Sequence, residues 1–251
     1  MKPLLFGPAG RPLYGVVHEP EGAPKTVGAI VCHPLPYEYA RLRWTHRILA
    51  DLLAREGFLS MRFDWSGTGD SNGSLDSVGL DTWVEDLGLA IAELRDAHEV
   101  SRVVVIAQGL AAAITAHASA RVPAVDDLVL VDPVVRGQDH LRWLRLNDHL
   151  PFGGGPNELL GQPLSSSLAR DLAAIDLSTT PIRCAGKRLG LETEQSRAVA
   201  ALLGHLAAPG REVAHRVVTA AADPTPGALD EVLVLPALPR EMARLISEVI
   251  A

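Results

Sequence analysis

The sequence predicts an α/β protein, in which the strands of a sheet alternate with the helices that cover it. Short β-branched runs alternate along the chain with longer stretches whose apolar residues recur at helical spacing. The chain has 251 residues, enough for one large domain, and 47% of them are hydrophobic. Because the net charge is only −7, this composition excludes a disordered chain.

Apolar runs predict the strands, and amphipathic stretches predict the helices between them. The predicted strands are Leu4–Phe6, Tyr14–His18, Val27–Cys32, Phe58–Phe63, Val103–Ala107, Leu128–Val131, Ile182–Ala185 and Val213–Thr219. The predicted helices are Leu42–Glu56, Asp81–Asp96, Leu110–Ala120 and Pro239–Ala251. A glycine-rich loop, Asp64–Ser71, follows the fourth strand.

One stretch interrupts this alternation. Residues 136–175 show no strand pattern, and they contain Gly153–Pro156 and a run of three serines. We predict that this insertion forms a short helical lid over a site, with residues 1–135 and 176–251 forming the core. An ordinary helical excursion is the alternative.

Composition excludes several classes of protein. No apolar run exceeds six residues, whereas a membrane span needs about 20. The N-terminus lacks the apolar core of a signal peptide, and Cys32 and Cys184 are too few for a disulfide framework. Acidic residues outnumber basic ones, 30 to 23, and no basic cluster indicates a nucleic-acid partner. We therefore expect a cytoplasmic protein without a membrane span.

Several segments together identify a family resemblance. They are His33-Pro34 with Glu38 and His46, Arg62–Asp64 followed by Gly67–Ser71, Trp83–Asp86, Asp132–Gly137 and Glu158–Ser165. From about residue 3 to residue 250 the chain resembles the α/β-hydrolases encoded beside exosortase systems, broadly of the serine aminopeptidase type. The resemblance implies a mostly parallel eight-stranded sheet flanked by helices, an oxyanion hole and a Ser-His-acid triad.

The sequence departs from this family at the triad. The nucleophile belongs on a sharp strand-to-helix turn, within Gly-x-Ser-x-Gly, where this chain has Ala107-Gln108-Gly109-Leu110-Ala111. The family's histidine follows the last strand, but residues 220–251 contain none, and His215 falls inside the predicted strand. We therefore predict a degenerate triad with Gly109 at the nucleophile position.

Glycine at this position favours survival of the turn itself. The nucleophile of such a turn has a strained, positive φ, which glycine adopts without steric cost. The N–H groups of Leu110 and Leu35 are then expected to remain as oxyanion donors. We predict that Leu35, Gln108, Gly109, Leu110 and Trp65 bind the substrate.

Three residues are candidates for catalysis. His33 lies at a strand end and titrates near neutral pH, so it is the candidate general base, with a structural hydrogen-bonding role as the alternative. Glu38 is a second candidate, or half of a structural ion pair; Asp132 either caps a helix or acts in the pocket. His33, Glu38 and His46 lack the spacing of a zinc motif, and we expect no metal or cofactor.

Three functions remain open. The first is a non-hydrolytic pocket that binds or converts an acyl or peptidyl biosynthetic intermediate, as a lyase, cyclase or isomerase, with a small-molecule or carrier-bound acyl substrate. The second is a hydrolase of esters, thioesters or amides that uses water activated by His33. The third is a non-catalytic pseudoenzyme that binds a partner protein.

Overall fold

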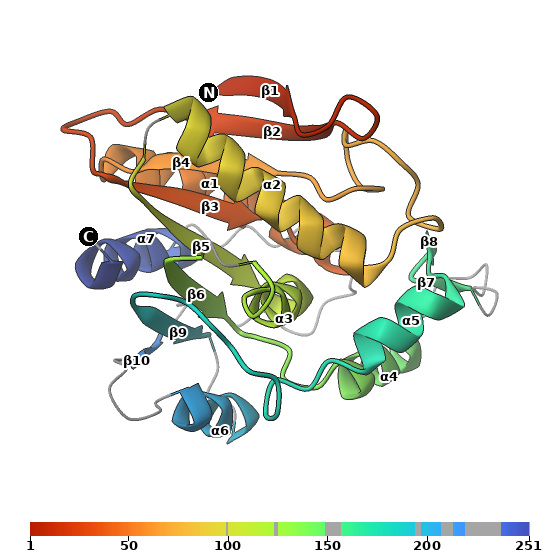
Figure 1. Ribbon diagram of the computed structural model, residues 1–251. Helices are drawn as coiled ribbons and strands as arrows, with labels where there is room; N and C mark the ends of the chain where they lie inside the picture. Colours follow the sequence, from red (N-terminus) through yellow and green to blue (C-terminus); the bar gives the residue numbers. More distant parts are fainter. Residues whose placement is uncertain are drawn as a thin grey trace.

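The computed structural model describes residues 1–98, 100–122, 125–148, 157–193, 197–206, 213–218 and 237–250. An eight-stranded sheet runs through this part of the chain in the order β1-β2-β4-β3-β5-β6-β9-β10 (Figure 1). Its strands are β1 (Lys2–Phe6), β2 (Leu13–His18), β3 (Val27–Cys32), β4 (Leu59–Phe63), β5 (Arg102–Gln108), β6 (Asp127–Val131), β9 (Arg188–Glu192) and β10 (Val213–Val217). β2 pairs antiparallel with β1 and β4, and the other neighbours pair in parallel, as predicted.

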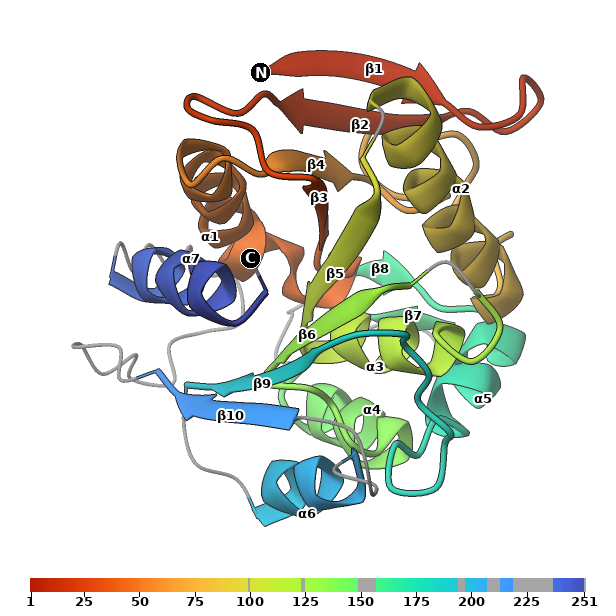
Figure 2. The ribbon, with the colours of Figure 1, turned by 60° about the vertical axis from the view of Figure 1, so that its left-hand side comes forward.

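Helices cover both faces of the sheet. They are α1 (Pro36–Arg55), α2 (Leu80–His98), α3 (Gly109–Ala118), α4 (Gly137–Leu146), α5 (Ser166–Ala173), α6 (Arg197–Leu206) and α7 (Ala237–Ile250). Figure 2 shows α1 and α7 on one side of the sheet and α2 and α3 on the other, and each side has its own buried apolar cluster. Among the described helices, none combines the length and the apolar composition that a membrane crossing requires.

The seventh strand lies later in the chain than predicted. Residues 182–185 are not a strand, and β9 begins instead at Arg188. Ile182 and Cys184 are buried as a loop, which the Ser119 hydroxyl holds by accepting the N–H of Arg183 at 3.0 Å. Ile182 and Cys184 are alternate residues that are buried in a loop, and this produces the same sequence pattern as a strand.

The insertion between β6 and β9 contains α4, α5 and a two-stranded hairpin. The hairpin strands are β7 (Glu158–Leu159) and β8 (Gln162–Pro163), so the prediction that residues 136–175 contain no strand is wrong at this point. Leu160 and Gly161 form its turn with φ of 51° and 70°. The predicted glycine run lies in residues 149–156, outside the described part of the chain.

Candidate functional site

The turn between β5 and α3 lies at the carboxyl edge of the parallel strands. Gln108 ends β5 in an extended conformation, and Gly109 begins α3 with φ of 61°. The predicted left-handed turn at Gly109 is thus confirmed. Its position also puts the first N–H groups of α3, which have no partner within the helix, at the edge of the sheet.

The carboxylate of Glu38 lies on this turn. Its Oε2 accepts a hydrogen bond from the backbone N–H of Leu110 at 3.1 Å. A Cβ atom added to Gly109 would lie 2.8 Å from the carboxyl carbon of Glu38, closer than real Cβ atoms approach other groups. The carboxylate therefore fills the space in which a side chain at position 109 would begin.

The start of α1 explains how Glu38 reaches this position. Leu35 is extended, with φ of −67° and ψ of 162°, and Pro36 opens the helix directly after it, as proline favours. The backbone N–H of Glu38 donates to the carbonyl of Leu35 at 2.8 Å. Glu38 thus belongs to the first turn of α1, and its side chain reaches the end of β5 from there.

His140 of α4 lies on the other side of the Glu38 carboxylate. Its Nε2 is 3.9 Å from Oε1 of Glu38, and both side chains are mostly buried. The His140 ring stacks on Trp143 at 6.0 Å between centroids. Burial lowers the pKa of His140 to about 4, so the imidazole is neutral at pH 7. Sequence reasoning missed this residue, because nothing local indicates that α4 returns to Glu38.

Behind the turn, hydrogen bonds connect α1 with three strand ends. Oε1 of Gln108 accepts from Nε2 of His46 at 3.1 Å, and the Gln108 side chain also bonds to Asp132. Asp132, at the end of β6 with φ of 41°, accepts the N–H and the hydroxyl of Thr193 at 2.7 and 2.9 Å. Gln108 therefore points away from the space beside Gly109, and Asp132 ties β6 to the end of β9.

Burial shifts the pKa values of this inner group. It lowers the pKa of His46 to about 4. It also raises the pKa of Asp132, and the charge of Glu192 acts in the same direction, while hydrogen bonds from Thr193 oppose the shift.

His33 and Trp65 lie beneath the turn. Nε2 of His33 is 3.1 Å from Nη1 of Arg62, and its Nδ1 is 3.2 Å from Oδ1 of Asp64. The Trp65 indole is fully buried against Phe63, and its N–H donates to the carbonyl of His33 at 2.8 Å. The structure thus brings Glu38, Gly109 and Leu110 together, and places His33 and Trp65 among supporting contacts.

His215 is the histidine that the sequence places too early in the chain to be the family's base. His215 lies inside β10, as expected, and its Nε2 is 2.6 Å from Oε2 of the buried Glu192. Residues 219–236, which follow β10, lie outside the described part of the chain. Across the described residues, no three His, Cys, Asp or Glu side chains gather as metal ligands.

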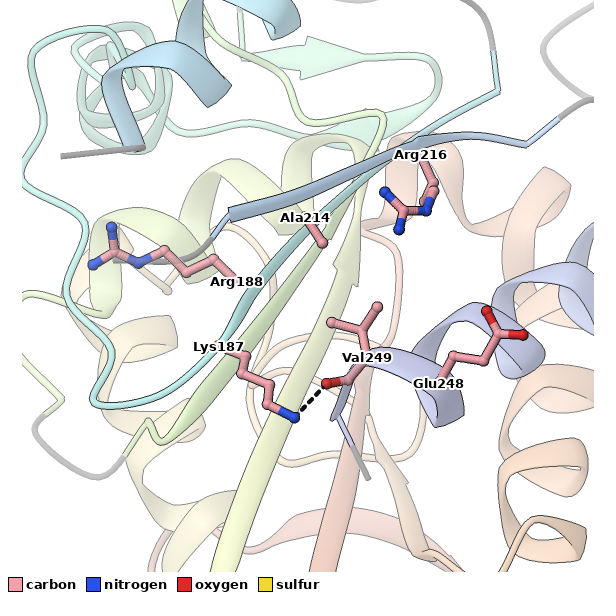
Figure 3. Close-up of a pocket in the computed structure, with 6 residues that line it drawn as sticks. All are labelled: Lys187, Arg188, Ala214, Arg216, Glu248 and Val249. Carbon is pink, nitrogen blue, oxygen red and sulfur yellow. Dashed lines mark hydrogen bonds between the residues drawn. The ribbon is translucent and has the colours of Figure 1, made fainter. Parts of the chain in front are cut away.

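A cavity of about 260 Å³ lies at the opposite edge of the sheet, where β9 begins (Figure 3). Lys187 lines it and donates to the carbonyl of Val249 at 2.6 Å. Arg188 points away from Lys187 in Figure 3, and its guanidinium donates to Cys184 and Ile182. The cavity's cationic side chains therefore satisfy protein groups, and the turn at Gly109 is the better candidate site.

A family model described as serine aminopeptidase S33 matches residues 40–176, more than half of the chain. The chain belongs to the serine aminopeptidase S33 family. The matched region includes the β5–α3 turn at Gly109.

Solved structures agree on the fold. The structure of Est1E from Butyrivibrio proteoclasticus with bound ferulic acid has a TM-score of 0.70 and 13% identity, covering 98% of this chain and 96% of that one. An esterase from Pyrococcus furiosus has a TM-score of 0.65 and 18% identity, covering 98% of this chain and 88% of that one. An α/β serine hydrolase homologue from Coxiella burnetii has a TM-score of 0.60 and 18% identity, covering 100% of this chain and 97% of that one. Such identities establish the α/β-hydrolase fold alone. No curated protein matched the sequence.

Proposed function

We propose that this chain is a non-hydrolytic member of the serine aminopeptidase S33 family that binds an acyl or peptidyl compound at the β5–α3 turn. The observation that carries the proposal is the Glu38 carboxylate on the Leu110 N–H, in the space beside Gly109. Glycine offers no nucleophile, so no acyl-enzyme forms at this position. Glu38 is the group that meets the substrate instead.

A carboxylate suits this position. The N-terminus of α3 favours a negative charge, and the Leu110 N–H stabilises it further. Glu38 then accepts a proton from the carbon beside an acyl carbonyl and returns it to another atom of the same molecule. Neither atoms nor electrons are gained, and no bond to the protein forms. This internal transfer is isomerase chemistry; in a lyase or cyclase the returned proton instead goes to the group that is expelled or displaced within the substrate. Neutral His140 is a second hydrogen-bonding group, 3.9 Å from the carboxylate.

The test combines binding and turnover on one panel of acyl thioesters, esters and N-acyl peptides. We expect saturable binding by calorimetry, weakened about tenfold by Glu38→Gln, because a charge-assisted hydrogen bond is lost. Gly109→Trp fills the space beside Glu38 and is expected to abolish binding, with circular dichroism as the check on folding. A fluorophosphonate probe, which labels activated serines, is expected to label nothing.

Two results would overturn the proposal. One is a fluorophosphonate-labelled serine, and the other is hydrolysis of the panel that survives Glu38→Gln. Hydrolysis lost in His33→Ala would instead favour water activated by His33. The geometry does not favour that alternative, because the ring nitrogens of His33 face Arg62 and Asp64.

A second candidate is a non-catalytic protein that binds a partner. The observation in its favour is that the Leu110 N–H is already occupied by Glu38 of the same chain. This function predicts no binding across the whole panel, together with recovery of one stoichiometric protein partner from cell extract. Saturable binding that Gly109→Trp removes would count against it.

A further inference from the structure

Arg62 of β4 lies between two histidines on the face of the sheet that α1 covers. Its Nε donates to Nε2 of His18 at 3.1 Å, and its Nη1 lies 3.1 Å from Nε2 of His33. An aspartate lies beyond each ring: Nδ1 of His18 is 2.7 Å from Asp51, and Nδ1 of His33 is 3.2 Å from Asp64. The guanidinium thus has two arms, His18 with Asp51 and His33 with Asp64, of which only the second leads toward Gly109. Asp51 hydrogen-bonds the His18 ring, whereas Nδ1 of His33 makes no hydrogen bond to any described residue.

The guanidinium fixes the proton state of both rings. Arginine has donors and no acceptor, so each Nε2 that faces Arg62 accepts and carries no proton. A protonated His33 would present an N–H to another N–H and would place two positive charges about 3 Å apart. The contact between Arg62 and His33 therefore exists only while His33 is neutral.

His33 holds the segment that leads to Glu38. Its carbonyl accepts from the Trp65 indole, and its ring packs against Tyr39 at 5.5 Å between centroids. Leu35, two residues later, accepts the N–H of Glu38. A displacement of His33 is therefore passed to the first turn of α1, which carries the Glu38 carboxylate.

We propose that Arg62 is a positioning residue, which acts through neutral His33 to hold the first turn of α1 where Glu38 reaches the Leu110 N–H. The inference rests on the proposed role of Glu38 and adds regulation to that site. Acid that protonates His33 breaks the contact with Arg62 and releases the carboxylate from the turn.

The surroundings of His33 set the direction of this response. It faces Arg62 and Asp64 from β4 and the loop after it, and Tyr39 and His46 from α1. Burial lowers the pKa of His33 well below 6.5, and the charges of His46 and Arg62 lower it further. The contact between Arg62 and His33 is therefore intact at neutral pH, and the Glu38 carboxylate is released from the turn only in acid.

The experiment observes the backbone amide of Leu110 by NMR in the full-length protein, with hydrogen exchange as a second readout. Four proteins are compared: the parent, His33→Ala, His33→Gln and His18→Ala. His18→Ala is the control, because it removes the other histidine contact of Arg62, on the arm that does not lead to Glu38. Thermal unfolding of each variant verifies that it is folded.

We expect His33→Ala to lose the downfield shift of the Leu110 amide and to exchange it about tenfold faster, while His18→Ala keeps both. His33→Gln supplies a carbonyl that accepts from Arg62 and that cannot be protonated. It is expected to rescue the Leu110 signal at neutral pH and to keep it on acidification until the Glu38 carboxyl is itself protonated, whereas the parent loses the signal at a higher pH.

Equal perturbation of Leu110 in His33→Ala and His18→Ala would overturn the proposal, since both arms would then be merely structural. So would the same acid response in the parent and in His33→Gln. The measurement needs no ligand, so its outcome is separate from the fate of the proposed function. A positioned Leu110 amide in a protein that binds no acyl compound would count against that function alone.

Discussion

Oε2 of Glu38 accepts the backbone N–H of Leu110 at 3.1 Å, where β5 becomes α3. The two residues are 72 positions apart in the chain. They meet because the first turn of α1 lies beside the end of β5 and because Gly109 has no side chain in the space that the carboxylate occupies. A carboxylate from α1 thereby accepts a hydrogen bond at the N-terminus of α3.

Gly109→Ser is expected to destabilise the protein by about 3 kcal/mol. The serine has to adopt a left-handed φ, and its Cβ pushes the Glu38 carboxylate off the Leu110 N–H. Urea denaturation measures the loss. In the double variant with Glu38→Ala the overlap disappears, and the deficit is expected to shrink to about 1–2 kcal/mol of backbone strain.

Gly10→Ser is the matched control for this prediction. Gly10 has nothing within 4 Å of an added Cβ, and its φ lies outside the left-handed region. The change is expected to alter stability by less than about 0.5 kcal/mol. If Gly109→Ser changes the stability as little as Gly10→Ser does, the carboxylate does not fill the space at position 109.

His46 is expected to make stability depend on pH. The unfolded residue titrates near 6.5, whereas burial lowers the folded pKa to about 4. Between these values only the unfolded state binds the proton. The contribution is therefore complete above pH 6.5 and is lost as the pH falls toward 4, by about 3 kcal/mol.

The measurement compares urea denaturation at pH 7 and pH 4 for the parent and for His46→Gln. The glutamine keeps a donor for Gln108 but does not titrate, so its stability is expected to fall less across this range. An identical fall in both proteins would mean that His46 is already solvated in the folded state.

Gln108→Glu is expected to cost about 3 kcal/mol at neutral pH, because it buries a second carboxylate beside Asp132. The folded pKa of the new carboxyl lies above its unfolded value, so the stability is retained at low pH and lost as the pH rises through the folded pKa.

Denaturation midpoints across acid and neutral pH test this sign. Gln138→Glu, on the exposed face of α4, is the control and is expected to change stability by less than about 0.5 kcal/mol. A Gln108→Glu protein with a pH profile like that of the control would show that water reaches this side chain.

Most of the sheet follows from local pattern. Val27–Cys32 and the runs over β5 and β6 are apolar throughout because helices cover both of their faces, and the sequence predicts all three. β9 was missed because Arg188 and Gly190 interrupt its apolar character. Arg188 is nevertheless buried, since its guanidinium donates to a carbonyl and a sulfur.

The site follows the sequence only in part. The left-handed turn at Gly109 is predictable, because the residue type and the strand-to-helix junction are both local. The contacts of Glu38 with Leu110 and His140 are not, since each joins separate elements of the tertiary structure. The same holds for Trp65, whose indole hydrogen bond to His33 is visible only in the folded chain.

Because Glu38 and a side chain at position 109 would share one space, a substitution at either position limits what the other can be. A serine introduced at position 109 places its Cβ against the Glu38 carboxylate, so a hydroxyl can occupy this turn only when that side chain moves aside or is replaced. The residue at position 109 and the side chain at position 38 therefore cannot be varied independently.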